Sequence, residues 1–349
     1  MGYQSRNVLI TGGLGFIGSN LALRAAALGA RVTVVDSSIE GCGANLHNLH
    51  PALDRIRLIP LDIAQAAEFA AEIGKADVIF NLAGEISHWH SMQFPERDLE
   101  INTFSQLRFL NVCREAAPGV RIIYAGTRQI YGVPQYLPVD EEHPIHPVDF
   151  NGVHKYAATM YHLMLTRAGY LDAAVLRLTN VYGPRMALHI PSQGFLSTYL
   201  RRIILGQPLE VFGDGAQLRD VVYVDDVVEA FLLAGDCPKL HSHTYNVGGP
   251  QPLPISEIAT TCARTAGGVP VTFRPFPDEL KRIDIGSYYT DWRRIRTELG
   301  WQPRIGLEEG LRRSVEYFRR ELQHYLKVAP EIEAATHSGP PLSQSALPQ

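Results

Sequence analysis

The sequence predicts an α/β protein built on a doubly wound parallel sheet. Three observations support this fold class. Short apolar, strand-like segments alternate with helical stretches, a glycine-rich turn follows the first segment, and an acidic residue ends the second. A chain of 349 residues, with 46% apolar and 19% charged residues, is typical of a soluble globular protein with ample material for a core.

The first β-α-β unit lies in the stretch NVLITGGLGFIGSNLALRAAALGARVTVVDSS. Residues 8–10 form an apolar strand, residues 16–28 have helical spacing, and residues 31–35 form a second, β-branched strand. Further strand-like runs follow at 56–60, 78–82, 121–124 and 174–178, with helical stretches between them. This alternation is typical of a doubly wound parallel sheet.

Three glycines stand between the first strand and the first helix, namely Gly12, Gly15 and Gly18. They allow a tight turn, a close approach of the backbone to a pyrophosphate, and close helix–strand packing. The helix that starts at Phe16 and Ile17 offers free N–H groups and a positive dipole end to phosphates. A purely structural turn would need the same glycines, but the flanking strands favour dinucleotide binding.

Asp36 ends the second strand, where a carboxylate binds ribose hydroxyls and repels a 2′-phosphate. The sequence therefore predicts NAD rather than NADP. The segments "LDI" at 61–63 and "NLAG" at 81–84 also follow strand ends, and they place four more residues at the cofactor edge: Asp62, Ile63, Leu82 and Ala83. Asp62 has a second interpretation as the N-cap of the following helix.

Composition excludes several functions. A net charge of −4 gives no electrostatic basis for binding nucleic acid or an anionic membrane, and no apolar run reaches the length of a membrane span. The chain enters its first strand directly after Arg6, so we expect no secretory signal. Four scattered cysteines indicate neither a metal site nor a disulfide framework, which predicts a reducing cytoplasm. The tail at 330–349, rich in Pro, Ser and Ala, is expected to be disordered.

From about Asn7 to Arg320 the chain resembles the extended short-chain dehydrogenase/reductase family, which contains the nucleotide-sugar epimerases and dehydratases. The resemblance rests on a series of motifs in order: "TGGLGFIG", "NLAG", "IN" at 101–102, "YAGTRQIYG", "NVYGP", "FGDGAQLRDVVYVDD", "NVGG" and "LGWQP". It implies a Rossmann-type NAD-binding domain at 1–180 that shares segments 233–249. A smaller substrate-binding lobe is implied mainly at 181–329, and Asn102 is implied to contact the cofactor.

The resemblance also assigns catalytic residues. Thr127 matches the hydroxyl residue that hydrogen-bonds the reacting oxygen of the sugar, and Lys155 matches the lysine that holds the nicotinamide ribose. Asn151 stands where the family has the tyrosine that acts as general base. An amide neither gives nor takes a proton near neutral pH, so the acid/base step needs another group.

Two further positions separate the reaction classes. In the family's 4,6-dehydratases the two residues after this threonine are an Asp/Glu pair that moves the protons needed to expel water. Here they are Arg128 and Gln129, neither of which is a general acid or base. Epimerisation needs only one hydride and one hydroxyl proton to leave and return, so the sequence favours an epimerase over a dehydratase.

The second half of the chain supplies the expected substrate contacts. Asn180, Arg219 and one of Lys281 and Arg282, Arg282 being preferred, are predicted to meet the sugar diphosphate. Phe212 would lie against the nucleotide base or in the core. Glu85, directly after "NLAG", is expected near the nicotinamide edge and the substrate.

His154 is the first candidate to replace the missing phenol. If a helix begins at Asn151, residues 151, 154, 155 and 158 share one face, and imidazole titrates near the working pH. The alternative is a histidine in solvent or at a subunit contact. The "HWH" stretch at 88–90 does not predict a metal site, because no third ligand accompanies it.

These observations leave three hypotheses. The first is an NAD-dependent nucleotide-sugar epimerase, resembling the 4-epimerases, that holds its NAD tightly. The second is another redox reaction on a nucleotide sugar, namely ketoreduction or dehydration. The third is a catalytically silent NAD-binding regulatory protein. The resemblance further implies a homodimer formed by the helices around 99–116 and 152–169, in which Ala157, Met160, Tyr161 and Met164 have helical spacing.

Overall fold

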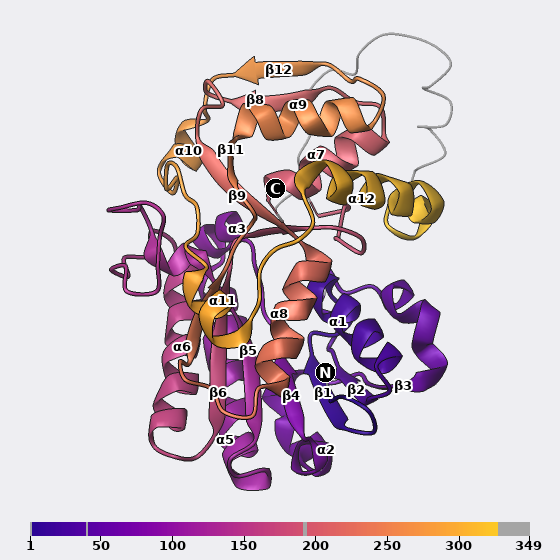
Figure 1. Ribbon diagram of the computed structural model, residues 1–349, viewed down its shortest axis with the longest axis vertical. Coiled ribbons are helices and arrows are strands. Elements are labelled where there is room, and N and C mark those ends of the chain that lie inside the picture. Colours follow the sequence, from indigo (N-terminus) through magenta and orange to yellow (C-terminus); the bar gives the residue numbers. More distant parts are fainter. Residues whose placement is uncertain (1, 40, 191–193, 327–349) are drawn as a thin grey trace.

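The structure is a computed structural model that describes residues 2–39, 41–190 and 194–326. A large sheet with flanking helices forms one lobe, and a smaller lobe lies above it in Figure 1. The predicted disordered tail at 330–349 lies outside the described residues. None of the described helices combines the length and the hydrophobicity needed to cross a bilayer.

The large sheet has seven strands, all parallel, in the order β10-β6-β5-β4-β1-β2-β3. Their bounds are β1 Asn7–Thr11, β2 Arg31–Val35, β3 Ile56–Ile59, β4 Val78–Asn81, β5 Arg121–Thr127, β6 Asp172–Leu178 and β10 Thr244–Val247. The predicted doubly wound parallel sheet is therefore confirmed. The strand order reverses between β1 and β4, and ligands of such sheets bind outside the carboxyl ends of the strands at this point.

Helices cover both faces of the sheet. On one face, α1 (Phe16–Ala27) packs against α8 (Val224–Asp236), and on the other lie α2 (Ala70–Lys75), α5 (Ser105–Ala116) and α6 (Phe150–Arg167). Successive side chains of β1 point to opposite faces, so Val8 and Ile10 enter one core cluster and Leu9 enters the other. Burial on both faces explains why the strand sequences are continuously apolar.

The smaller lobe contains a three-stranded sheet, β11-β9-β7, and a two-stranded sheet, β12-β8. The strand bounds are β7 Asn180–Tyr182, β8 Leu209–Phe212, β9 Leu218–Tyr223, β11 Pro252–Pro254 and β12 Val271–Arg274. The helices of this region are α7 Phe195–Ile204, α9 Ile255–Thr265, α10 Asp278–Lys281 and α12 Leu307–Glu321. In Figure 1 they gather around β8, β9 and β12.

The chain returns to the large sheet earlier than the implied shared segment 233–249. Helix α8 begins at Val224 and contacts β4 and β5, and β10 then pairs with β6 at the sheet edge. Helix α11 (Arg293–Leu299) contacts β10 as well. The carboxyl ends of the central strands thus face the smaller lobe.

The expected helix around 99–116 is interrupted. The structure has α4 (Pro95–Leu99), a π-helical turn η3 (Glu100–Phe104) and then α5. The turn places buried Asn102, whose Oδ1 accepts a hydrogen bond from the backbone N–H of Glu85 at 3.1 Å. Single π-turns inside helices occur often at functional sites.

The remaining short elements connect these parts. They are the 3₁₀ segments η1 Leu46–Arg55, η2 Ile63–Phe69, η4 Arg128–Tyr131 and η5 Leu322–His324, and the helix α3 His88–Gln93.

Candidate active site

A cavity of about 220 Å³ opens at the point where the strand order reverses. Seven of the residues predicted to bind the cofactor line it: Gly12, Gly15, Asp36, Asp62, Ile63, Leu82 and Ala83. Phe16, Ile17 and Gly18 form the first turn of α1, directly after Gly15. These residues follow four different strands in the sequence, and the fold places them around one cavity.

The backbone of the glycine turn is packed tightly, as is typical of a dinucleotide-binding turn. Gly12 has a φ of 68°, and a Cβ there would lie 2.7 Å from the backbone oxygen of Leu82. A Cβ at Gly18 would collide with the backbone oxygen of Gly12, whereas one at Gly15 would meet only that oxygen, at 3.2 Å. No side chain caps the first turn of α1, and uncapped N–H groups at the start of a helix are donors for an anion such as a phosphate.

Asp36 and Asp62 lie on the same cavity wall. Asp36 accepts hydrogen bonds from the backbone N–H groups of Leu14 and Ser38, both at 2.9 Å, and burial raises the pKa of its carboxyl group. Asp62 accepts from the N–H of Ala64 at 2.7 Å and forms a capping box at the start of η2. Its predicted N-cap role is therefore confirmed, and it lines the cavity as well.

Lys155 approaches the same site from α6. Asp149 caps this helix by accepting the N–H of Gly152 at 2.7 Å, which sets the start of the helix at Phe150. A Cβ on Gly84 would lie 2.8 Å from Lys155 Nζ and 2.7 Å from Asn102 Oδ1, so a larger residue here would displace these two side chains. Burial lowers the pKa of Lys155 to about 8, against the attraction of nearby carboxylates.

Asn151 and His154 are joined through Asp98. The Nδ2 of Asn151 donates to Asp98 Oδ2 and to the backbone oxygen of Glu85, both at 3.0 Å, and Asp98 Oδ1 lies 2.7 Å from His154 Nδ1. All three side chains are buried, so the interpretation of His154 as a solvent-exposed histidine is wrong. Asp98 was missed because "PERDLE" has the appearance of an ordinary charged helix.

The ring of Tyr124 on β5 lies beside Lys155. Lys155 Nζ lies 5.8 Å from the centroid of its ring, which is fully buried and stacks on His162. Burial raises the pKa of Tyr124 above its usual value, so this phenol stays protonated at neutral pH. It is not a relocated general base.

Thr127 ends β5, and Arg128 and Gln129 begin η4. The Oγ1 of Thr127 accepts the N–H of Gln129 at 3.2 Å, and the amide of Gln129 donates to Asp149 at 2.8 Å. Arg128 donates to Asn180 Oδ1 at 3.3 Å and thereby connects the sheet to β7 of the smaller lobe.

Glu85 lies in a buried polar cluster. Its Oε2 accepts from the Cys42 thiol at 3.3 Å, and its Oε1 is 3.9 Å from His90 Nδ1. His88 instead pairs with Asp149 at 3.1 Å. The two histidines of α3 therefore face different carboxylates and do not form one metal site together. A different group that could hold a metal by proximity, His47, Glu321 and His324, has two imidazole rings stacked at 3.7 Å.

The predicted diphosphate ligands come from the smaller lobe. Arg219 on β9 is buried, donates to the backbone oxygen of Leu218 at 2.8 Å and lies 3.7 Å from Asp284. Burial lowers its pKa to about 10, and the charge of Arg128 adds to this effect. Arg282 is exposed at the end of α10.

Phe212 is 40% exposed at the end of β8, and its ring centroid lies 5.9 Å from that of Phe276. Its alternative assignment to the core is therefore wrong, because the strand ends at the surface of the lobe.

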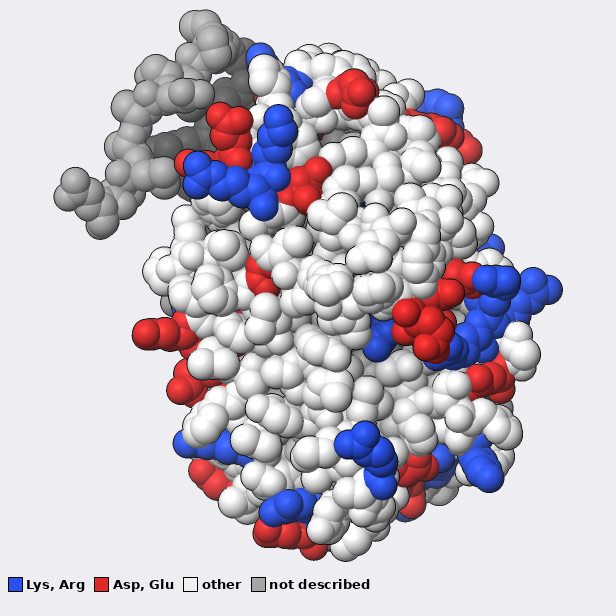
Figure 2. Space-filling view, turned by 90° about the vertical axis from the view of Figure 1, so that its left-hand side faces the viewer, with Lys and Arg blue, Asp and Glu red and all other residues white. Residues whose placement is uncertain are grey.

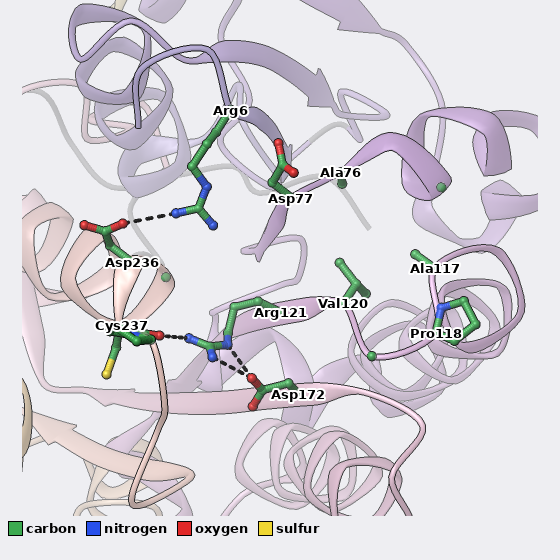
Figure 3. Close-up of a pocket in the computed structure, with 14 residues that line it drawn as sticks. Arg6, Ala76, Asp77, Ala117, Pro118, Val120, Arg121, Asp172, Asp236 and Cys237 are labelled. Atoms are coloured by element: carbon green, nitrogen blue, oxygen red, sulfur yellow. Dashed lines mark hydrogen bonds and ion pairs between the residues drawn. The ribbon is translucent and has the colours of Figure 1, made fainter. Parts of the chain in front are cut away.

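A second pocket, of about 480 Å³, lies at the opposite edge of the sheet, where β1, β4, β5 and β6 begin (Figure 3). Four of its charged side chains form two pairs, Arg6 with Asp236 at 3.1 Å and Arg121 with Asp172 at 2.8 Å, and Asp77 accepts the N–H of Asn7 at 2.7 Å. Arg121 also donates to the backbone oxygen of Cys237 at 2.7 Å, so its charge is compensated without a ligand.

Comparison with known proteins agrees with this geometry. Residues 8–248 match the model of the NAD dependent epimerase/dehydratase family. A UDP-glucose 4-epimerase of Mycolicibacterium smegmatis is 33% identical over 323 residues, which cover 90% of this chain and 99% of that protein. A solved UDP-glucose 4-epimerase of Thermotoga maritima, with UDP-glucose, is 30% identical with a TM-score of 0.81 and covers 90% of this chain and 99% of its own.

A third relative was solved with cofactor. MoeE5 in complex with UDP-glucuronic acid and NAD is 29% identical, has a TM-score of 0.77, and covers 90% of this chain and 99% of its own. Residues 8–248, which the family model matches, include the glycine turn, the residues that line the cavity and the strands that carry Thr127 and Asn180. This chain belongs to the NAD-dependent epimerase/dehydratase family.

Proposed function

We propose that this protein is an NAD-dependent epimerase of a nucleotide-diphosphate sugar, acting at C4, with UDP as the nucleotide. The observation that carries the reaction type is the arrangement around Thr127. Lys155 is placed beside the cofactor cavity, while Arg128 and Gln129 occupy the positions where dehydration would need an acid/base pair. UDP is supported by relatives named UDP-glucose 4-epimerases and solved with UDP-sugars.

The residues have distinct roles in this proposal. When bound, NAD supplies the hydride acceptor and donor. Lys155 holds the nicotinamide ribose, and Thr127 hydrogen-bonds the hydroxyl of the reacting carbon. Asn180, Arg219 and Arg282 hold the diphosphate, Phe212 lies against the base, and Glu85 borders the sugar beside Gly84. Asp36 and Asp62 bind the adenosine end.

The hydroxyl proton must move without a tyrosine at position 151. The Nδ2 of Asn151 donates hydrogen bonds to Asp98 and to the backbone oxygen of Glu85, so the proposed role of Asn151 is to hold these two residues in position. His154, one side chain further along the same hydrogen-bonded chain, is the proposed store for the proton. A placed group of this kind contributes about 10²–10⁴-fold to the rate.

The alternatives are less well supported. Dehydration would need a proton donor after Thr127, and a silent NAD-binding protein would need no buried arginine in the substrate lobe. The sugar itself is not set by the relatives, because MoeE5 was solved both with UDP-glucose and with UDP-glucuronic acid.

Epimerisation can be tested by incubating the NAD-loaded protein with UDP-sugars deuterated at C4 and following the products by NMR and mass spectrometry. We expect the epimer to form with its deuterium retained, because the hydride returns to the same carbon. Lys155→Ala and Thr127→Ala should each lower the rate at least a hundredfold. Exchange of the label with solvent, or full activity in both variants, would place the chemistry elsewhere.

The assembly proposed is a homodimer in the cytoplasm. On α6, Met160 is 43% and Met164 46% exposed, and Leu99 and Phe104 are exposed nearby on α4 and η3. The side of the molecule that carries α6 in Figure 1 faces the viewer in Figure 2, where charged side chains leave a broad area uncovered. All four cysteines are free, which supports a reducing compartment.

A further inference from the structure

Arg128 is a cation without a described anionic partner. Its only described hydrogen bond runs from Nη2 to Asn180 Oδ1, at 3.3 Å, and within the described residues no carboxylate lies close enough to form an ion pair. Its Nη1 is closed to solvent and has no hydrogen-bond partner. A guanidinium has five donors, and a buried one left unpaired is costly. The arrangement calls for an anion supplied from outside the protein.

The nearby carboxylates are occupied by other groups. Asp220 accepts from Thr179 at 2.7 Å and from the N–H of Gly249 at 3.2 Å, while Asp149 is bound by Gln129 and Gly152.

Asp284 accepts from Gln217 at 2.7 Å and faces Arg219. These acids attract Arg128 through space, and burial lowers the pKa of its guanidinium despite that attraction. Within the described residues, none of these three carboxylates forms a hydrogen bond or an ion pair with Arg128.

The residues around Arg128 indicate which anion it binds. Its guanidinium lies 4.9 Å from the centroid of Tyr288, and the backbone of Tyr288 bridges to that of Arg219. Arg219 is already assigned to the diphosphate. Arg128 follows Thr127 directly in the chain, so its backbone lies next to the residue proposed to contact the hydroxyl of the reacting carbon.

Sugar chemistry then limits the choice. The diphosphate leaves the ring at the anomeric carbon, on the side opposite C4. The neighbour of C4 is C5, which carries the exocyclic C6. A group that approaches the ring beside Thr127 therefore meets the C6 substituent before it meets the diphosphate.

We propose that Arg128 binds a carboxylate at C6 of the sugar and that the substrate is a nucleotide-diphosphate hexuronic acid. This inference rests on the proposed function, because it uses Thr127 to position the sugar. A planar guanidinium binds a carboxylate in a bidentate manner through two parallel N–H groups, and Nη1 and Nη2 supply them here. The other possible source of negative charge is the diphosphate itself.

Calorimetry on the NAD-loaded protein separates the two sources with three probes: UDP, UDP-glucose and UDP-glucuronic acid. We expect the wild-type protein to bind UDP-glucuronic acid at least thirtyfold more tightly than UDP-glucose. Arg128→Gln should remove most of that difference, and Arg128→Lys, which keeps the charge without the fork, should retain part of it. Arg219→Gln, the matched control in the same cleft, should weaken all three probes by a similar factor.

Other results would overturn the proposal. Equal affinity of the wild-type protein for UDP-glucose and UDP-glucuronic acid would show that the site does not recognise the carboxylate. Equal weakening of the binding of all three probes by Arg128→Gln would assign Arg128 to the diphosphate. Circular dichroism and the melting temperature establish that each variant is folded. If UDP-glucuronic acid is preferred but neither sugar is epimerised, the proposed function fails and this inference stands. Failure to bind any probe removes both.

Discussion

Asn151 belongs to a network of buried side chains. The amide of Asn151 reaches Asp98, and Asp98 in turn holds the imidazole of His154. The sequence predicts that Asn151 takes the place of a phenol, because it stands four residues before a lysine. It did not show Asp98, since a buried aspartate on a short surface helix has no periodicity that distinguishes it from a solvated one.

We expect His154→Ala to lower turnover at least a hundredfold if the imidazole stores the hydroxyl proton. The loss should be partly restored by added imidazole, and the dependence of kcat on pH should change. His241→Ala, at an exposed position, is the control and should be silent. If His154 were merely structural, its replacement by alanine would lower the melting temperature, and added imidazole would not restore turnover.

Lys155 makes stability depend on pH in a defined direction. Its pKa is lowered to about 8 from the ordinary value of 10.5, so between these values the unfolded chain binds more protons than the folded protein. The contribution of Lys155 to stability therefore rises with pH across this window, by up to about 1.4 kcal/mol per pH unit. Urea unfolding of the NAD-free Lys155→Met variant should show higher stability than wild type at pH 7, with the difference shrinking toward pH 10. A constant difference would contradict the lowered pKa.

Asp36 should determine which dinucleotide binds. Its carboxylate is fixed on the cavity wall by two backbone N–H groups and would lie against a 2′-phosphate. Calorimetry should give at least tenfold tighter binding of NAD than of NADP, a difference of about 1.4 kcal/mol or more. Asp36→Asn should reduce that ratio, and equal affinities in the wild-type protein would refute the assignment.

Among the elements, the parallel strands were predictable and the interrupted helix was not. β1, β2 and β4 are apolar on both faces, so their composition alone distinguishes them from loops. The π-turn η3 carries Asn102, which accepts a hydrogen bond from Glu85 in a separate segment of the chain. Local helix propensity carries no information about such a contact.

Helix α6 is the element on which assembly is predicted to depend. Met160 and Met164 are exposed on one stripe with Val153, while the opposite side of the helix carries Lys155 into the site. We expect Met160→Glu with Met164→Glu to convert the dimer to a monomer in analytical ultracentrifugation at micromolar concentration. Phe273→Glu, which alters an exposed aromatic residue of the smaller lobe, should leave the dimer intact. A monomeric wild-type protein would contradict the prediction.

For the whole molecule, the motifs predicted the cofactor cleft better than they predicted the substrate side. The glycine turn, Asp36 and "NLAG" converge because carboxyl ends of parallel strands share one edge. On the substrate side, the sequence predicts of Arg128 only that it is not a general acid or base. Its contact with Asn180 and its unpartnered nitrogen arise from the meeting of the two lobes, which no single segment encodes.

The late position of β10 has a consequence for synthesis on the ribosome. β6 ends at Leu178, but its outer neighbour is not made until residues 244–247, and α8, which covers one face of the sheet, is made shortly before. Until then the emerging chain carries an open strand edge and an apolar surface over β4 and β5 that α8 has not yet covered, and both favour aggregation. A chain that stops between the two lobes is therefore not a free-standing NAD-binding module, and a chaperone that binds the nascent protein would be needed most during this interval.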